Sequence, residues 1–304
     1  MSKHLFWIAS FPKSGNTLLR AIISSLFFSE DGRFDFSMLN KIPIIEDTVN
    51  LNFIKTTNPK DFKDIHKLEI LAKYWLEAQS KNNLNFNGDF MFVKTHHALI
   101  KYFDNPFTSD DNTRGIIYVV RDPRDVVLSM CKHYNFNIKK SIEKITNVNF
   151  SLKWSDDNNL FINRELPFSL LSNWENHYKS WKKNSFGCPQ LFIKYEDLVY
   201  NKKEVIKNLI VFFEKNYGFK FSNTEEKINN IVNETNFERL KKKEELYGFQ
   251  EATSGAFFNV GKKNQWLEKL EKNEVYKIEK NFINTLNELD YDLKNFDSAN
   301  NKKV

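Results

Sequence analysis

The sequence predicts an α/β fold: a single domain with a central parallel sheet flanked by helices. Short apolar runs of strand-like composition alternate with segments in which apolar residues recur every three or four positions. No Pro/Gly/Ser-rich linker and no fixed-period repeat divides the 304 residues, of which 41% are hydrophobic. Such alternation favours parallel strands, because each connection then crosses over through a helix.

The first expected elements follow in chain order. LFWIAS (5–10) is predicted as a strand, and the apolar residues from Leu18 to Phe27 then recur at helical spacing. FMFVKTH (90–96) and GIIYVVR (115–121) are predicted as further strands. The second is apolar on both faces, which is typical of a buried parallel strand.

The remaining elements begin with a helix start at Asp122-Pro123-Arg124-Asp125, which supplies an N-cap, a first-turn proline and an acidic third residue. This predicts a helix through about His133. QLFIKYEDL (190–198) begins as a strand. Helical patterns follow the segments 169–184, 202–216, 223–242 and 268–289.

Segments 29–89, 135–168 and 243–262 have weaker periodicity and are rich in Asn, Phe and Trp. Insertions of this kind in an α/β enzyme usually shape the substrate pocket, and surface covering is the alternative.

Composition narrows the class of partner. A net charge of +6 suits an anionic small ligand, but it is too mild and dispersed to indicate nucleic-acid binding. Cys131 and Cys188 form no disulfide framework, which favours a reducing compartment. The first strand begins near Leu5, and no apolar run reaches membrane-spanning length. We therefore expect a soluble cytoplasmic protein without a membrane span.

The joint between the first strand and the first helix reads Phe11-Pro12-Lys13-Ser14-Gly15-Asn16-Thr17. Unpaired backbone N–H groups at a helix start attract an anion. Gly15 lets the backbone approach closely, the hydroxyls of Ser14 and Thr17 donate, and Lys13 adds a charge. An ordinary strand-to-helix turn would also contain Ser, Gly and Asn.

The carboxyl ends of the predicted strands favour the anion site. Ligands of parallel sheets bind at these ends. The residues there fall in the ranges 12–17, 94–97, 121–125 and 195–197, and three of these four places carry a cation or a histidine.

The order Pro-Lys-Ser-Gly-x-Thr is not the nucleotide P-loop, which places its lysine after a second glycine. It resembles the phosphosulfate-binding loop of the cytosolic-type sulfotransferases, which use 3′-phosphoadenosine-5′-phosphosulfate (PAPS). The resemblance implies a P-loop-like phosphosulfate-binding loop after the first strand, with PAPS-binding residues at Lys13, Ser14, Gly15, Asn16 and Thr17.

A second signature of that family is an arginine after a buried strand and a serine eight positions later, which together grip the 3′-phosphate. GIIYVVRDPRDVVLS supplies Arg121 and Ser129. Arg121 would leave the strand end and Ser129 would lie about two turns into the next helix, so both could reach one phosphate.

A third match is VKTHHAL, which resembles the family's Lys-Thr-His segment at a strand end. The resemblance makes His96 the general base that removes the acceptor proton, with Lys94 and Lys13 as catalytic cations. A near-neutral pKa suits a histidine to this role. His97 has no counterpart in the motif and is interpreted as structural or substrate-facing.

Weaker resemblances extend the match to about residues 5–290. They imply further PAPS contacts at Tyr195, Thr235, Phe237, Asn259, Gly261 and Lys262. The domain is expected to span 1–295, with 296–304 as a disordered tail.

The sequence departs from the family pattern at three places. Leu18 stands where an aromatic residue often stacks on adenine, and Asn16 replaces a threonine. Asn259-Val260 replaces an Arg-Lys pair, and Lys262 and Lys263 are the candidates to compensate.

The implied activity is transfer of a sulfuryl group from PAPS to a hydroxyl or amine of a small-molecule or carbohydrate acceptor, without a required metal. Two alternatives remain open. One is a nucleotide-binding module without transfer activity, which the altered Asn259-Val260 segment favours. The other is a P-loop kinase or ATPase, against which the absent GK[ST] sequence argues.

Overall fold

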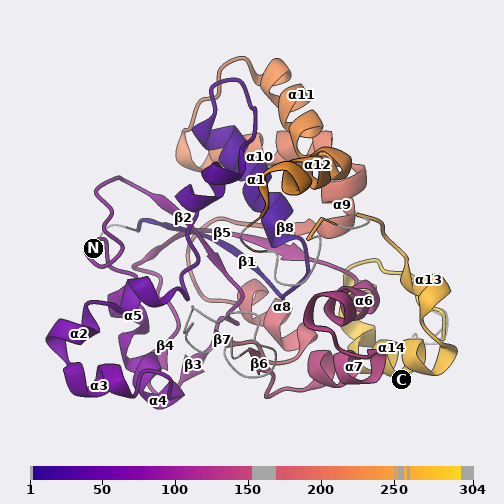
Figure 1. Cartoon of the computed structure of the whole chain (residues 1–304), viewed down its shortest axis with the longest axis horizontal. Helices are drawn as coiled ribbons and strands as arrows, with labels where there is room; N and C mark the ends of the chain where they lie inside the picture. The colour runs from indigo at the N-terminus through magenta and orange to yellow at the C-terminus, as the bar shows by residue number, and fades with distance from the viewer. Residues whose placement is uncertain (1–2, 153–168, 250, 252–256, 259–260, 296–304) are drawn as a thin grey trace.

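The computed structural model describes residues 3–152, 169–249, 251, 257–258 and 261–295. Over these residues, the centre of the fold is a four-stranded parallel sheet of order β2-β1-β5-β8 (Figure 1). Its strands are β1 (Leu5–Ser10), β2 (Met91–Thr95), β5 (Thr113–Val120) and β8 (Gln190–Lys194). Helices cover both faces, so the predicted α/β fold with a central parallel sheet is confirmed.

Two helical layers enclose this sheet (Figure 1). The helices on one face are α1 (Asn16–Phe28), α9 (Tyr195–Tyr200), α10 (Lys202–Tyr217), α11 (Thr224–Glu234) and α12 (Phe237–Tyr247). Those on the other face are α6 (Pro123–Tyr134), α7 (Ile138–Thr146), α8 (Trp174–Lys182) and α14 (Lys272–Glu288).

Shorter elements complete the described chain. The short α-helices are α2 (Ile54–Thr57), α3 (Pro59–Lys63), α4 (Leu68–Leu71), α5 (Trp75–Ala78) and α13 (Trp266–Lys269). Three 3₁₀ helices span Phe36–Lys41, Thr48–Leu51 and Ala72–Tyr74. The two small antiparallel pairs join β3 (Lys101–Tyr102) to β4 (Asn105–Pro106) and β6 (Ser151–Leu152) to β7 (Ser169–Leu170).

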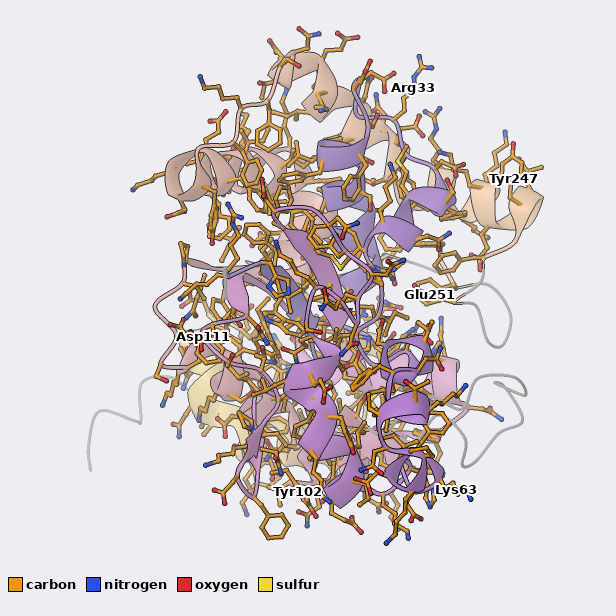
Figure 2. The ribbon with its side chains drawn as sticks, turned by 90° about the vertical axis from the view of Figure 1, so that its left-hand side faces the viewer. Arg33, Lys63, Tyr102, Asp111, Tyr247 and Glu251 are labelled. Atoms are coloured by element: carbon orange, nitrogen blue, oxygen red, sulfur yellow. The ribbon has the colours of Figure 1, made fainter. Side chains whose placement is uncertain are left out.

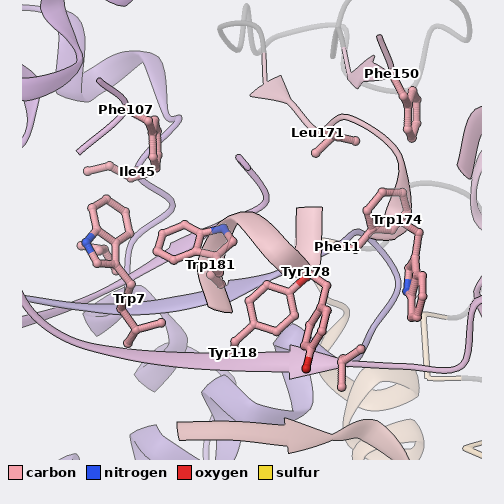
Figure 3. Packing of buried hydrophobic residues seen from close by; sticks show 14 of the residues in the cluster. Trp7, Phe11, Ile45, Phe107, Tyr118, Phe150, Leu171, Trp174, Tyr178 and Trp181 are labelled. Carbon is pink, nitrogen blue, oxygen red and sulfur yellow. The ribbon is translucent and has the colours of Figure 1, made fainter. Parts of the chain in front are cut away.

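The alternation of side chains along β1 explains why both faces are covered. Leu5 and Trp7 point into one core and Phe6 and Ile8 into the other, and all four are fully buried. Figure 3 shows the first core, where Trp7 lies near Trp181 of α8. Burying a large apolar side chain contributes roughly 1.5–3 kcal/mol, so each layer is held to the sheet by many such terms.

Three helical predictions differ from the structure in their boundaries. The pattern at 268–289 is divided between α13, which ends at Lys269, and α14, which begins at Lys272, because Leu270 is extended. The pattern at 169–184 contains a strand, β7, and α8 starts only at Trp174, because Ser172 has a φ of +59° and Asn173 caps the helix. The pattern at 223–242 is two helices, since the Asn236 side chain accepts a hydrogen bond from Glu238 N and starts α12 anew. The expected tail at 296–304 lies outside the described residues.

The strand order fixes where a ligand can bind. From β1 the chain goes to β2 on one side, and β5 and β8 lie on the other side. The connections therefore diverge beside β1, and a crevice opens at the carboxyl ends of β1 and β5. In the part of the chain that the structure describes, we find no helix with the length and apolarity needed to cross a membrane.

Candidate active site

The loop after β1 has the backbone geometry that an anion site needs. Lys13 and Gly15 both have positive φ, +66° and +101°. Gly15 is the N-cap of α1 and provides no capping side chain, so the first N–H groups of the helix remain available to a ligand. A Cβ at Gly15 would lie 2.4 Å from Cδ2 of Tyr195, which leaves glycine as the fitting residue.

One pocket gathers most of the predicted site residues from separate elements. Lys13 comes from the loop after β1, Lys94 and His96 from the end of β2, and Arg121 and Ser129 from the end of β5 and from α6. The other predicted residues that line it are Gly15, Asn16, Thr17, Tyr195 and Phe237.

Four predicted PAPS-binding residues do not line this pocket. Ser14 is buried beside it, and its Oγ has no hydrogen-bond partner among the described residues. Thr235 is buried at the C-terminal end of α11, and its hydroxyl donates to Ile231 O. Gly261 packs against the Phe237 ring, and Lys262 is exposed. A fifth, Asn259, lies outside the described residues.

The Arg121 side chain is held by two contacts within the protein. Its guanidinium lies 4.2 Å from the centre of the Tyr195 ring, and its Nη1 donates to Lys13 O at 3.1 Å. Its Nε is buried and has no partner among the residues that the structure describes. A buried, unpaired guanidinium donor is the kind of group that an anionic ligand satisfies.

His96 has a defined tautomer. Its Nδ1 lies 2.8 Å from Ser10 O, and because a carbonyl oxygen only accepts, Nδ1 carries the proton. Nε2 is then the unprotonated nitrogen. Burial, followed by the charge of Lys94, holds the pKa of His96 well below its ordinary value, so the ring is neutral near pH 7.

His97 points the other way, as strand alternation predicts. Its ring is fully buried and stacks on Phe107 at 4.1 Å between ring centres, with the Trp75 ring edge-on at 4.8 Å. Burial lowers the pKa of His97 to about 3. The sequence left open whether His97 is structural or faces the substrate, and this placement favours the structural role.

Asn16 ties the loop to the sheet. Its amide nitrogen donates to Ile8 O and to Ser10 Oγ, both at 3.1 Å. Both amide hydrogens of Asn16 are therefore engaged within the protein.

Glu251 is a charged residue of the site that the sequence analysis did not predict. Its carboxylate pairs with Arg20, accepts a hydrogen bond from Thr17 Oγ1 at 3.2 Å and lies 3.8 Å from Lys94 Nζ. Burial alone would raise the pKa of Glu251, but Lys94 and Arg20 outweigh it and lower the pKa to about 2. Figure 2 shows Glu251 on the right-hand side of the view, below Tyr247 and above Lys63.

Burial and the neighbouring cations perturb the pKa of Lys13. Burial, then the charges of Lys94 and Arg121, lower the pKa of Lys13 to about 7, and Glu251 opposes this shift. Because one carboxylate does not balance the charge of several buried cations, this cluster favours the binding of a further anion. The remaining lining residues are Pro12, Leu18, Ile44, His133, Tyr134, Phe257 and Phe258.

The fold and the pocket define an α/β protein that presents a helix N-terminus, several cations and a neutral histidine to one ligand. The model of the sulfotransferase domain family matches residues 3–290. The chain therefore belongs to this family, and the resemblance found in its motifs is confirmed.

Individual relatives are distant. The chain is 25% identical over 237 residues to Sulfotransferase 1B1 of Canis lupus familiaris, covering 77% of this chain and 65% of the relative. It is 29% identical over 239 residues to the Amine sulfotransferase of Oryctolagus cuniculus, covering 77% and 62%. The matches thus span just under two thirds of these relatives' length.

Solved structures share the fold. Retinol dehydratase in complex with androsterone and the inactive cofactor PAP superposes with a TM-score of 0.58 at 21% identity, over 97% of this chain and 83% of that one. Mouse sulfotransferase SULT7A1 complexed with PAP superposes with a TM-score of 0.56 at 16% identity, over 95% and 85%.

Proposed function

We propose that the protein transfers a sulfuryl group from PAPS to a hydroxyl or amine of a small-molecule or carbohydrate acceptor. The observation that carries this proposal is the convergence of Lys13, Lys94, His96, Arg121 and Ser129 on one pocket at three strand ends. Family membership supports the same reaction class.

Different residues of the pocket would bind different parts of PAPS. The start of α1 and Lys13 would bind the 5′-phosphosulfate, and Arg121 with Ser129 would bind the 3′-phosphate. Phe237 and Leu18 line the pocket as apolar groups against which the adenine would pack. The unpaired Ser14 Oγ and Arg121 Nε fit this assignment, because oxygens of the two anionic groups would satisfy them, one at the 5′ end and one at the 3′ end.

The proposed reaction is an in-line displacement at sulfur. The acceptor oxygen or nitrogen forms a bond to sulfur while the bond from sulfur to the bridging phosphate oxygen breaks. His96 Nε2 takes the acceptor proton, and the electron pair leaves with adenosine 3′,5′-bisphosphate. Lys13 and Lys94 stabilise the charge that grows on the transferred and leaving oxygens, where one well-placed donor contributes roughly 3–4 kcal/mol.

The test combines binding with transfer. We expect adenosine 3′,5′-bisphosphate to raise the melting temperature, because a ligand of the folded state stabilises it by mass action. Incubation with ³⁵S-labelled PAPS and a panel of phenols, aliphatic alcohols, sugars and amines should then label at least one acceptor. Binding without any transfer would favour the binding module. Magnesium-dependent ATP turnover with no response to the bisphosphate would favour the kinase alternative.

Glu251→Gln is expected to make the binding of adenosine 3′,5′-bisphosphate about tenfold tighter, while it lowers the stability of the free protein. The Glu251 carboxylate accepts the hydrogen bond of the Thr17 hydroxyl and neutralises the charges of Lys94 and Arg20. An anion that binds these groups must therefore displace the carboxylate. Titration calorimetry at low salt measures the first effect and thermal melting the second. Glu245→Gln, on the exposed side of α12, is the control and should change neither.

The pH dependence of this variant follows from the pKa of Glu251. A folded-state pKa of about 2, below the ordinary 4.5, stabilises the protein above pH 4.5, and this stability is lost as the pH falls toward 2. The difference in melting temperature between wild type and Glu251→Gln should therefore shrink on acidification. Weaker bisphosphate binding by the variant would show that Glu251 maintains the site rather than competing for it.

A further inference from the structure

The turn that carries His96 is held by a carboxylate from a distant segment. Residues 43–45 run along the free edge of β2, where Lys94 N donates to Pro43 O at 2.8 Å and Ile45 N donates to Lys94 O at 3.0 Å. Glu46 comes next. Its Oε1 accepts hydrogen bonds from His96 N at 3.0 Å and His97 N at 3.2 Å.

The same oxygen also accepts from the Thr95 hydroxyl at 2.5 Å. Three donors that follow one another along the chain thus converge on Glu46 Oε1. Beyond Thr95 the strand β2 has ended, and a carboxylate here satisfies backbone donors that a neighbouring strand would otherwise pair. Burial raises the pKa of Glu46, and the Thr95 hydrogen bond opposes this shift.

The opposite side of the turn is fixed as well. His177 Nε2 donates to His96 O at 2.9 Å, and Tyr118 OH donates to His177 Nδ1 at 2.8 Å. Burial lowers the pKa of His177 to about 4, which keeps it in this neutral form. The His96 residue is therefore held at its N–H by Glu46, at its carbonyl by His177 and at its ring by Ser10.

We propose that Glu46 is a positioning residue for the reaction: its hydrogen bonds to the Thr95–His97 turn set the direction in which the His96 imidazole enters the pocket. The inference rests on the proposed role of His96 as base. Misplacing a reacting group by about 1 Å can cost about 10²-fold in rate, so the turn needs a rigid anchor. Glu46 acts through His96 and makes no contact with the acceptor in this scheme.

The test compares Glu46→Ala with Glu46→Gln, whose amide oxygen can accept the same N–H groups. Turnover is measured with the best acceptor of the panel at saturating substrates, and bisphosphate affinity by calorimetry. We expect Glu46→Ala to lower kcat about 10–10²-fold, with bisphosphate affinity within about twofold of wild type. Glu46→Gln should regain most of the kcat.

A second readout follows the His96 ring itself. The imidazole titration by NMR should move toward the ordinary pKa of about 6.5 in Glu46→Ala, because a loosened turn admits water. Glu175→Gln is the matched control, since Glu175 also accepts a hydrogen bond from a threonine hydroxyl, Thr285 at 2.6 Å. It should lower stability without changing kcat or the His96 titration.

The outcomes separate this inference from the proposed function. If His96→Ala keeps full turnover, the base assignment fails. If His96→Ala loses turnover and Glu46→Ala does not, only the positioning role fails. Equal kcat in Glu46→Ala and Glu46→Gln would also overturn it. If Glu46→Ala does not fold, Glu46→Asp replaces it, and a folded Asp variant with wild-type kcat would contradict the proposal.

Discussion

Replacing His96 by alanine is expected to lower turnover by about 10²–10⁴-fold, the usual range for losing a positioned general base. The ring lines the pocket, and its Nδ1 proton is engaged with Ser10 O, so Nε2 is free of that proton and able to accept one. Bisphosphate affinity should change by no more than about twofold, because the proposed phosphate contacts come from Lys13 and Arg121. Single-turnover rates and calorimetry measure the two effects separately.

His97→Ala is the control for this prediction. His97 stacks on Phe107 in the core, so its loss should lower the melting temperature and leave the turnover of the folded protein largely intact. If His97→Ala were the variant that lost turnover, the base would have been assigned to the wrong histidine.

The pH profile gives an independent check on His96. Burial and Lys94 hold its pKa well below the ordinary value of 6.5, so the ring stays neutral at mildly acidic pH. We expect kcat/KM, which reports the ionisation of the ligand-free protein, to be retained on acidification through pH 6.5 and to fall only as the ring becomes protonated below that. A profile that loses activity with a midpoint at or above 6.5 would contradict the buried, neutral base.

Sequence reasoning located those parts of the site whose spacing is local. Lys94 lies near the end of β2 and His96 follows it two residues later, just past the strand, while Arg121 and Ser129 are joined by one helix. Such pairs have their relative positions set by the 2-residue and 3.6-residue periods of strand and helix. The loop before α1 was predictable because its residues are consecutive in the sequence.

The remaining contacts were beyond reach because they join segments far apart in sequence. Glu251 meets Thr17 and Arg20 from 234 and 231 positions away. Glu46 meets the turn at His96 from 50 positions away. Neither carboxylate lies in a periodic pattern, and a lone acidic residue in a weakly periodic segment is ordinarily solvated. Their roles follow only from tertiary packing.

Local patterns also failed where a single backbone conformation decided the outcome. The apolar spacing of 169–184 continues smoothly into α8, yet the left-handed Ser172 ends β7 and turns the chain before the helix can begin. A serine at this position does not by itself predict a positive φ. Element boundaries near such residues need the structure.

Arg121→Ala is expected to weaken adenosine 3′,5′-bisphosphate by about 10–10²-fold and 5′-AMP by about threefold or less. The difference arises because only the bisphosphate carries the 3′-phosphate that we propose Arg121 binds, and the Nε of Arg121 is buried without a partner among the described residues. A charged hydrogen bond to such a group contributes roughly 1.5–3 kcal/mol, which gives the expected range. Calorimetry with both nucleotides on both proteins measures the four affinities.

The comparison with 5′-AMP matters because Arg121 has a second role in the free protein. Its Nη1 donates to Lys13 O, so removing the side chain loosens the loop that would bind the 5′-phosphate. This loosening lowers the affinity for both nucleotides. Ser129→Ala touches no loop contact of this kind and should give a smaller loss confined to the bisphosphate. Equal weakening of the two nucleotides by Arg121→Ala would mean that Arg121 acts through the loop alone. The 3′-phosphate would then have to be bound by other residues. The exposed Lys262 and Lys263 would be the next residues to replace.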